Sequence, residues 1–184
     1  MTIISRLRSL HLLYLSKPAA DRPIYRAIRN RETHKIVELG IGSGQRALRM
    51  IGVAQRTVPD SEIHYVGMDL FEGRPAANGP SLSLKVAHQL LRSTGVRVQL
   101  VPGNPADSLI RLANSLGKVD LLIVPAELDS PASARVWFFV PRMLHERSLV
   151  FVERVRSDGQ KTFTIKPRHE IDQLAAAGFS RRAA

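Results

Sequence analysis

The chain has 184 residues, 44% of them hydrophobic, and carries 27 Lys and Arg against 16 Asp and Glu, a formal net charge of +11. A chain of this length builds one ordinary globular core, so we expect a single domain. It contains no cysteine, which excludes disulfides, thiolate nucleophiles and Cys-ligated metals and favours a reducing compartment, the cytoplasm.

Residues 1–34 are predicted to form a helical lead-in to a single domain over residues 35–184. In "MTIISRLRSLHLLYLS" apolar side chains recur at helical spacing, which favours an amphipathic helix (Ile3, Leu7, Leu10 and Tyr14). The arginines and serines of this segment, with no acid among them, also fit an organellar transit peptide. No apolar run in the chain approaches the roughly 18 residues of a membrane span, so we expect a soluble protein.

Strands and helices alternate at least five times along the rest of the chain. Apolar runs typical of buried parallel strands occupy residues 35–39, 63–70, 96–101, 119–125 and 148–155. Helical patterns cover residues 44–56, 81–94, 105–116, 130–144 and 169–179, and residues 71–80 are predicted to form a loop. This alternation predicts an α/β fold, a doubly wound, mostly parallel sheet with helices on both faces and right-handed crossovers.

Helical spacing also predicts which side chains face the core. The predicted inner faces are Ala47, Ile51 and Ala54 in the first of these helices, Leu82, Val86 and Leu90 in the second, and Leu109, Leu112, Ala113 and Leu116 in the third. Pro141 lies inside the predicted helix over residues 130–144 and should kink or shorten it, because proline removes a backbone donor.

The segment "KIVELGIGSG", residues 35–44, joins the first predicted strand to the first helix of the domain. Its glycines would lie at the carboxyl edge of the sheet, where open α/β folds bind ligands, and they allow both a tight turn and close approach of a ligand. A phosphate-binding P-loop is excluded because no Gly-Lys-Ser/Thr follows. A dinucleotide fingerprint fails at its third glycine, where Gln45 stands, which leaves an NAD-dependent oxidoreductase as the weakest alternative.

The spacing Glu38-x-Gly40-x-Gly42-x-Gly44 resembles the first motif of class I S-adenosylmethionine-dependent methyltransferases. The resemblance implies a Rossmann-like fold over roughly residues 34–154 and S-adenosylmethionine as the cofactor. A carboxylate beside the glycines would disfavour a pyrophosphate but suits a ligand that carries an ammonium and a sulfonium. We therefore expect Glu38 and the three glycines to form part of the cofactor site.

Three downstream residues extend the resemblance. Asp69 ends the second strand, where the family places an acid that accepts hydrogen bonds from both ribose hydroxyls, although NAD enzymes also have an acid here. By the same pattern, Leu70 would pack on the adenine. Asn104 stands where many members have an aspartate; its amide could bind the adenine edge, cap the helix that begins at Pro105, or do both.

Other positions depart from the family's pattern. In the metal-dependent, catechol-type branch the fourth strand ends in a metal-binding aspartate, whereas Pro125 stands here; we interpret the nearby Glu127 and Asp129 as solvated loop acids and expect no metal site. A full class I fold adds a helix and an antiparallel hairpin after the fifth strand. Here at least one strand is expected to be missing, so a second copy could cover the edge of the sheet.

No residue stands out as a catalytic base. Glu127, Asp129, His88 and His145 are candidates, but a lone histidine in a helix or turn is more often structural or solvated than catalytic. Methyl transfer needs little from side chains, because the sulfonium is already activated and the protein chiefly aligns the acceptor. The catalytic residues are therefore left unassigned.

The sequence thus predicts an S-adenosylmethionine-dependent methyltransferase that acts on a small-molecule acceptor. One alternative is a degenerate relative that binds the nucleoside without turnover. The other is an RNA methyltransferase, because the excess positive charge gathers at the ends of the chain: +6 over residues 1–35, +1 over 36–141 and +4 over 142–184. Against RNA, the basic ends show no interleaved aromatic residues and no target-base motif is present.

Overall fold

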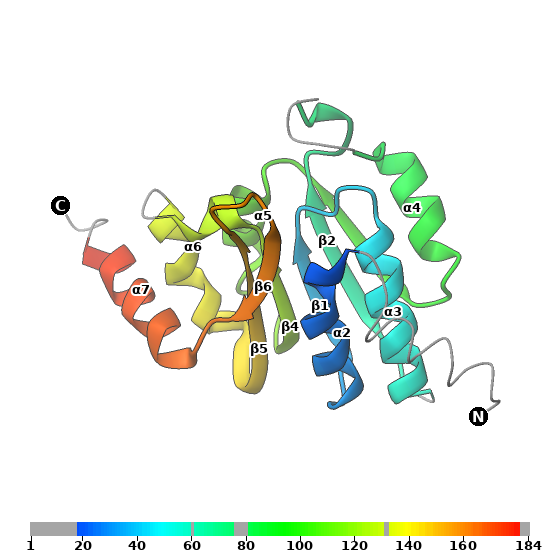
Figure 1. Ribbon diagram of the computed structural model, residues 1–184, viewed down its shortest axis with the longest axis horizontal. Helices are drawn as coiled ribbons and strands as arrows, with labels where there is room; N and C mark the ends of the chain where they lie inside the picture. The colour runs from blue at the N-terminus through cyan, green and yellow to red at the C-terminus, as the bar shows by residue number, and fades with distance from the viewer. Residues whose placement is uncertain (1–17, 60, 76–80, 131–132, 181–184) are drawn as a thin grey trace.

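The computed structural model describes residues 18–59, 61–75, 81–130 and 133–180. Its strands form one six-stranded sheet in the order β3-β2-β1-β4-β5-β6 (Figure 1). The strands are β1 (Lys35–Leu39), β2 (His64–Asp69), β3 (Arg97–Pro102), β4 (Val119–Val124), β5 (Leu144–Val155) and β6 (Lys161–Ile165). The doubly wound α/β fold predicted from the sequence is confirmed.

Strands β1 to β5 are parallel, and β6 alone runs antiparallel, paired with β5. The chain order reverses between β1 and β4, so the connections that follow these two strands run to opposite faces of the sheet. Sheets of this kind bind ligands in the crevice that such a reversal leaves at the carboxyl ends of the strands. In Figure 1 the carboxyl ends of the parallel strands point upward. One strand follows β5 in the described part of the chain, as expected for a shortened sheet.

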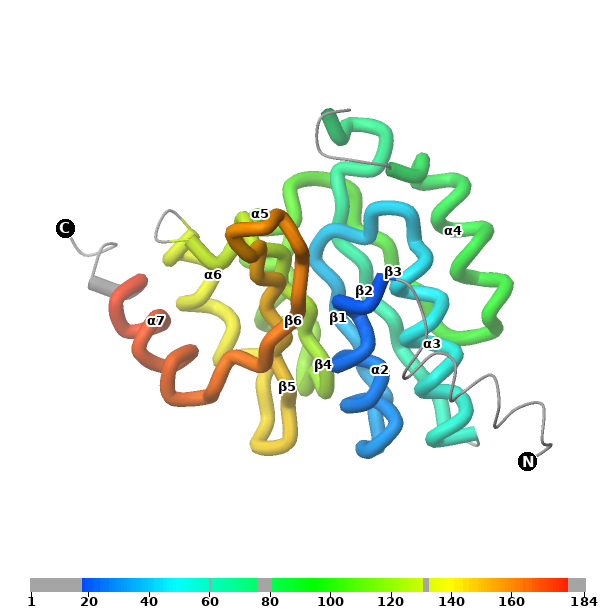
Figure 2. Tube along the Cα trace, viewed as in Figure 1, coloured from blue at the N-terminus to red at the C-terminus, as the bar shows by residue number. Residues whose placement is uncertain are grey.

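Helices cover both faces of the sheet, and Figure 2 shows the path of the chain between them. They are α2 (Arg22–Arg29), α3 (Gln45–Thr57), α4 (Leu84–Arg92), α5 (Pro105–Leu112), α6 (Ala134–Phe139) and α7 (Arg168–Ser180). Short 3-10 turns complete the chain: η2 (Ala19–Asp21), η3 (Phe71–Gly73), η5 (Ala126–Asp129) and η7 (Val140–Met143). Helices α2, α3 and α4 contribute to one apolar core, and α5, α6 and α7 to the core on the other face.

The helical faces follow the predicted spacing with one exception. The predicted inner face of α3 (Ala47, Ile51 and Ala54) is buried, as are Leu109, Ala113 and Leu116 in and after α5. Helix α4 buries a different face from the one predicted: Val86 is 46% exposed, whereas Ala87 and Leu91 are buried. The helix begins only at Leu84, capped by the Ser83 hydroxyl, and Ala87 packs with Ile41 and Phe71 in a small third apolar cluster.

Pro141 shortens its helix, as predicted. Helix α6 ends at Phe139, and the chain continues as the 3-10 turn η7, since a proline at this position cannot donate the next helical hydrogen bond. Strand β5 then begins at Leu144, four residues earlier than expected, and the pairing of β4 with β5 shifts register between Val119 and Leu121.

The lead-in contributes to the same core as the sheet. Ile24, Tyr25 and Ile28 of α2 are fully buried and pack with residues of α3 and β1. The amphipathic helix predicted over residues 3–14 lies outside the described residues. The predicted loop over residues 71–80 begins with η3, and its residues 76–80 also lie outside the described part.

Candidate functional site

The glycine segment forms a turn at the carboxyl end of β1. Gly40, Gly42 and Gly44 have φ values of 78°, 60° and 75°, in the left-handed region that side chains with a Cβ rarely adopt. At Gly44 an added Cβ would also lie 3.0 Å from Leu82 Cδ1. The sequence therefore needs glycine at these positions to turn from the buried strand β1 into α3 within five residues.

Asp69 closes the turn from the neighbouring strand. Its side chain is 2% exposed, and its Oδ2 accepts a hydrogen bond from the Gly42 amide at 3.0 Å, while Oδ1 accepts one from the Phe71 amide at 3.0 Å. The Asp69 carbonyl accepts from the Gly103 amide at 3.0 Å, just after β3. The glycine turn and the carboxyl ends of β2 and β3 therefore meet at Asp69.

Arg74 forms a forked ion pair with the same carboxylate. Its Nη2 lies 2.6 Å from Asp69 Oδ2 and its Nε 3.2 Å from Oδ1. Burial alone would raise the pKa of Asp69, but the hydrogen bonds from Arg74, Gly42 and Phe71 outweigh it and hold the pKa below its ordinary value. Asp69 is therefore ionised at neutral pH.

Glu38 lies beneath the turn and is fully buried. Its Oε1 accepts from Arg46 Nε at 2.7 Å and its Oε2 from the Tyr65 hydroxyl at 2.5 Å. Burial raises the pKa of Glu38, and the guanidinium of Arg46 opposes this shift. Both carboxylate oxygens therefore have donors within the protein, and the charge of Glu38 is balanced by Arg46.

Arg46 connects Glu38 to other parts of the fold. Its Nη2 donates to the Gly40 carbonyl at 3.1 Å, its Nη1 lies 3.8 Å from Asp21 Oδ1, and its guanidinium lies 5.0 Å from the ring centroid of Phe163 in β6. Asp21, which is 4% exposed, also accepts a hydrogen bond from the Tyr25 hydroxyl. The network thus ties the glycine turn to both η2 and the edge strand.

Sequence reasoning missed Arg46, Arg74 and Asp21. The available signal was electrostatic: an acid inside a buried strand needs a cation, and Arg46 lies in the first turn of the next helix. No comparable signal pointed to Arg74, because the loop in which it lies has no periodicity.

Leu70 and Asn104 flank the same edge of the sheet. Leu70 is half-buried and lies between Asp69 and the start of η3. Asn104 is exposed, and its Oδ1 accepts from the Ala106 amide at 2.9 Å and the Asp107 amide at 3.5 Å, so it caps α5 as predicted. All seven predicted residues lie in or just after the carboxyl half of β1, β2 or β3 (Glu38, Gly40, Gly42, Gly44, Asp69, Leu70 and Asn104).

The acids after β4 have different surroundings. Glu127 is exposed, but the carboxylate of Asp129 is 5% exposed and lies 2.6 Å from Arg154 Nη1 and 3.0 Å from Lys166 Nζ. The interpretation of Asp129 as a solvated loop acid is therefore wrong, because two cations hold it in the protein. Among the described residues, no group of three or more His, Cys, Asp or Glu side chains could hold a metal ion.

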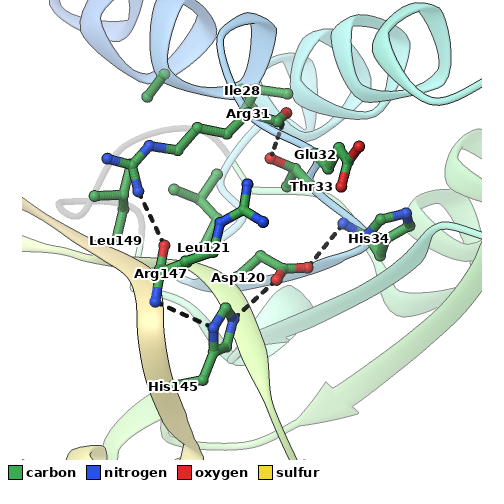
Figure 3. Close-up of a pocket in the computed structure, with 11 residues that line it drawn as sticks. Ile28, Arg31, Glu32, Thr33, His34, Asp120, Leu121, His145, Arg147 and Leu149 are labelled. Carbon is green, nitrogen blue, oxygen red and sulfur yellow. Dashed lines mark hydrogen bonds and ion pairs between the residues drawn. The ribbon is translucent and has the colours of Figure 1, made fainter.

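The histidine candidates lie away from the glycine turn or in solvent. His145 Nε2 lies 2.9 Å from Asp120 Oδ1, at the amino ends of β4 and β5, where the two residues line a cavity of about 100 Å³ (Figure 3). This cavity lies at the amino ends of the strands, opposite to the carboxyl ends at which the glycines lie. His88 is exposed on α4.

Similar solved structures are methyltransferases. The O-methyltransferase TomG from Streptomyces achromogenes, in complex with SAM, is 14% identical with a TM-score of 0.55 over 100% of this chain and 79% of its own. A provisionally assigned caffeoyl-CoA O-methyltransferase from Staphylococcus aureus is 15% identical with a TM-score of 0.54 over 99% and 81%. SAH-bound PaMTH1 from Podospora anserina is 19% identical with a TM-score of 0.50 over 95% and 70%.

No family model matches the sequence, and no curated protein matches it significantly. The order of the strands in the sheet and the glycine turn after β1 define a Rossmann-like α/β protein. More particularly, the chain has the fold of the class I S-adenosylmethionine-dependent methyltransferases, which confirms the fold that its first motif indicated. None of the described helices combines the length and apolar character needed to span a membrane.

Proposed function

We propose that the protein binds S-adenosylmethionine over the glycine turn and transfers its methyl group to a small-molecule acceptor. One observation carries the proposal. Three glycines with positive φ follow β1, and the ionised carboxylate of Asp69, at the end of β2, accepts a hydrogen bond from the amide of the middle glycine, Gly42. The glycines place no β-carbon against the ligand, and Asp69 supplies acceptors for ribose hydroxyls once Arg74 moves aside. The methyltransferase fold and the cofactor-bound structures of TomG and PaMTH1 support it.

The described residues fit this cofactor. Asp69 would hold the ribose, Leu70 would contact the adenine, and Asn104 could reach its edge while it caps α5. Glu38 contributes indirectly: with its oxygens held by Arg46 and Tyr65, it fixes the underside of the turn. When bound, S-adenosylmethionine supplies a methyl group already activated by the sulfonium, so the protein needs to position the acceptor and exclude water.

Calorimetric titration with S-adenosylhomocysteine tests the proposal, with NAD and ATP as controls. We expect micromolar binding of S-adenosylhomocysteine alone. Asp69→Ala should weaken it at least about tenfold, which corresponds to the loss of one charge-assisted hydrogen bond. Asp69→Asn should give a smaller loss, and Asp172→Ala, an exposed acid on α7, should give none.

Thermal melts must accompany these variants, because Asp69 also holds the amides of Gly42 and Phe71. Unchanged affinity in a folded Asp69→Ala protein would disprove the site assignment. Binding of NAD instead would indicate an NAD-dependent oxidoreductase.

Labelled-methyl incorporation from cell extract then tests the reaction and its acceptor. Label in small molecules is expected. Label in nuclease-sensitive material would favour an RNA acceptor, and tight binding without any transfer would favour the non-catalytic alternative. The cytoplasm remains the compartment that we propose, from the absence of cysteine.

A further inference from the structure

We infer that Arg74 makes the crevice selective for nucleosides that carry a carboxylate, because it must give up Asp69 when ribose binds and can then pair with that carboxylate. This inference rests on the proposed function and assigns a specificity-determining role to a residue outside the motif.

The hydrogen bonds of Asp69 lead to this conclusion. A carboxylate offers about four acceptor positions, and four donors already occupy those of Asp69. They are the Gly42 amide, the Phe71 amide, and Nε and Nη2 of Arg74. The two ribose hydroxyls can therefore donate to this carboxylate only if one of the present donors leaves.

Arg74 is the donor that can leave. The Gly42 and Phe71 amides belong to the backbone of the turn and of η3, so neither can withdraw without a change of fold. Arg74 reaches the carboxylate through a flexible side chain, of which 18% is exposed. Exchange of Arg74 for ribose is thus the least disruptive way to free Asp69.

The position of the guanidinium indicates its next partner. A Cβ built on Gly40 would lie 3.6 Å from Arg74 Nη2, so the group spans the distance from the ribose-binding acid to the first glycine. The ligand group attached to the ribose would lie over these glycines. In S-adenosylmethionine and S-adenosylhomocysteine that group ends in an amino-acid carboxylate, which suits the planar fork of arginine.

A nucleoside without the carboxylate displaces Arg74 from Asp69 and offers the guanidinium no anion in exchange. A carboxylate-bearing nucleoside exchanges one ion pair for another. Arg74 therefore weakens binding of the first class and strengthens binding of the second relative to it.

The experiment compares S-adenosylhomocysteine with its decarboxylated analogue, which keeps the nucleoside, the thioether and the ammonium. Calorimetric affinities are measured for the wild-type protein, Arg74→Ala, Arg74→Lys and the control Arg92→Ala, an exposed arginine in the last turn of α4. The wild-type protein should prefer S-adenosylhomocysteine by about tenfold or more, as expected for a charge-assisted hydrogen bond.

In Arg74→Ala the analogue should bind more tightly than to the wild-type protein, and the preference should fall at least about fivefold. Arg74→Lys keeps the charge without the fork and should retain part of the preference. Arg92→Ala should behave as the wild type. A preference that is unchanged in Arg74→Ala would overturn the inference and leave the proposed function intact.

The two failures are distinguishable. If S-adenosylhomocysteine binds neither the wild-type protein nor Arg74→Ala, the proposed function fails and the inference fails with it. If it binds Arg74→Ala only, Arg74 blocks the crevice without accepting the carboxylate, and the inference is equally overturned. Thermal melts show whether each variant is folded, which we expect because Asp69 keeps its two backbone donors.

Discussion

Arg46 Nε lies 2.7 Å from Glu38 Oε1, and this ion pair joins the first turn of α3 to the buried end of β1 directly beneath the glycine turn. The Glu38 carboxylate is inaccessible to solvent and the Arg46 side chain is 19% exposed. Removal of one partner would leave a buried charge without its counter-ion, which is far more costly than the net value of the pair.

Arg46→Met should therefore lower the free energy of unfolding by about 3–5 kcal/mol. Denaturant unfolding measures the change, with Arg92→Met as an exposed arginine control. The double variant Glu38→Gln/Arg46→Met should recover part of the loss, because glutamine keeps an acceptor for Tyr65 without the charge. Equal losses in the single and double variants would show that the buried charge is not the cause.

Gly178→Ala should destabilise the packing of α7 on α6. A Cβ at Gly178 would lie 2.7 Å from the carbonyl oxygen of Ala134 and 3.3 Å from Phe138 Cβ, so the helices would have to separate. We expect a loss of about 1–3 kcal/mol, as for other overpacked contacts. Gly73→Ala is the control, since an added Cβ there meets nothing within 4 Å. Equal melting temperatures of Gly178→Ala and the wild type would contradict the contact.

His64 should make the protein less stable at acidic pH. Burial lowers its pKa below the ordinary value of 6.5, with Lys35 and Arg97 adding to the effect, and its Nε2 is buried without a hydrogen-bond partner in the described residues. Because the folded protein binds this proton less readily than the unfolded chain, the stability is present above pH 6.5 and falls as the pH drops below it.

Melts at pH 7.5 and 5.5 measure this dependence, which should shrink in His64→Gln and persist in His88→Gln, a variant of the exposed histidine on α4. An identical pH dependence in His64→Gln and the wild type would remove His64 as its source.

The sequence predicted the parallel sheet and the glycine turn because both depend on local patterns: continuous apolar strands, and glycines at positions that require positive φ. The partners of the acids were not predicted. Arg74 and Arg46 reach Asp69 and Glu38 only through the folded geometry, as Arg154 and Lys166 reach Asp129. Side chains that meet by tertiary contact leave no periodic signal in a single sequence.

Asn104 allows its two roles to be separated. Serine is also a good N-cap but is too short to reach an adenine edge, so Asn104→Ser should change stability by only a few tenths of a kcal/mol. The affinity of Asn104→Ser for S-adenosylhomocysteine should nevertheless fall several-fold if the Asn104 side-chain amide contacts the adenine. Asn104→Ala should lose about 1 kcal/mol of stability as well. Wild-type affinity in Asn104→Ser would leave the residue as a helix cap only.

Asp120 provides the opposite case, a residue that should affect stability without affecting the cofactor. Its Oδ2 accepts from the amides of His34 and Lys35 at 2.8 and 2.7 Å, and its Oδ1 lies 2.9 Å from His145 Nε2. Figure 3 shows Asp120 between His34 and His145.

Asp120→Ala leaves two amides at the start of β1 without their acceptor and should lower the free energy of unfolding by about 1–3 kcal/mol. His145→Ala removes the contact with Asp120 and the Nδ1 acceptor of the Arg147 amide, which is exposed, and should therefore cost less. In both variants that remain folded, the affinity for S-adenosylhomocysteine should equal that of the wild type, because β1 separates this cavity from the crevice. A parallel fall in affinity would mean that the two edges of the sheet are coupled through β1, and would contradict the placement of the cofactor site at the carboxyl edge alone.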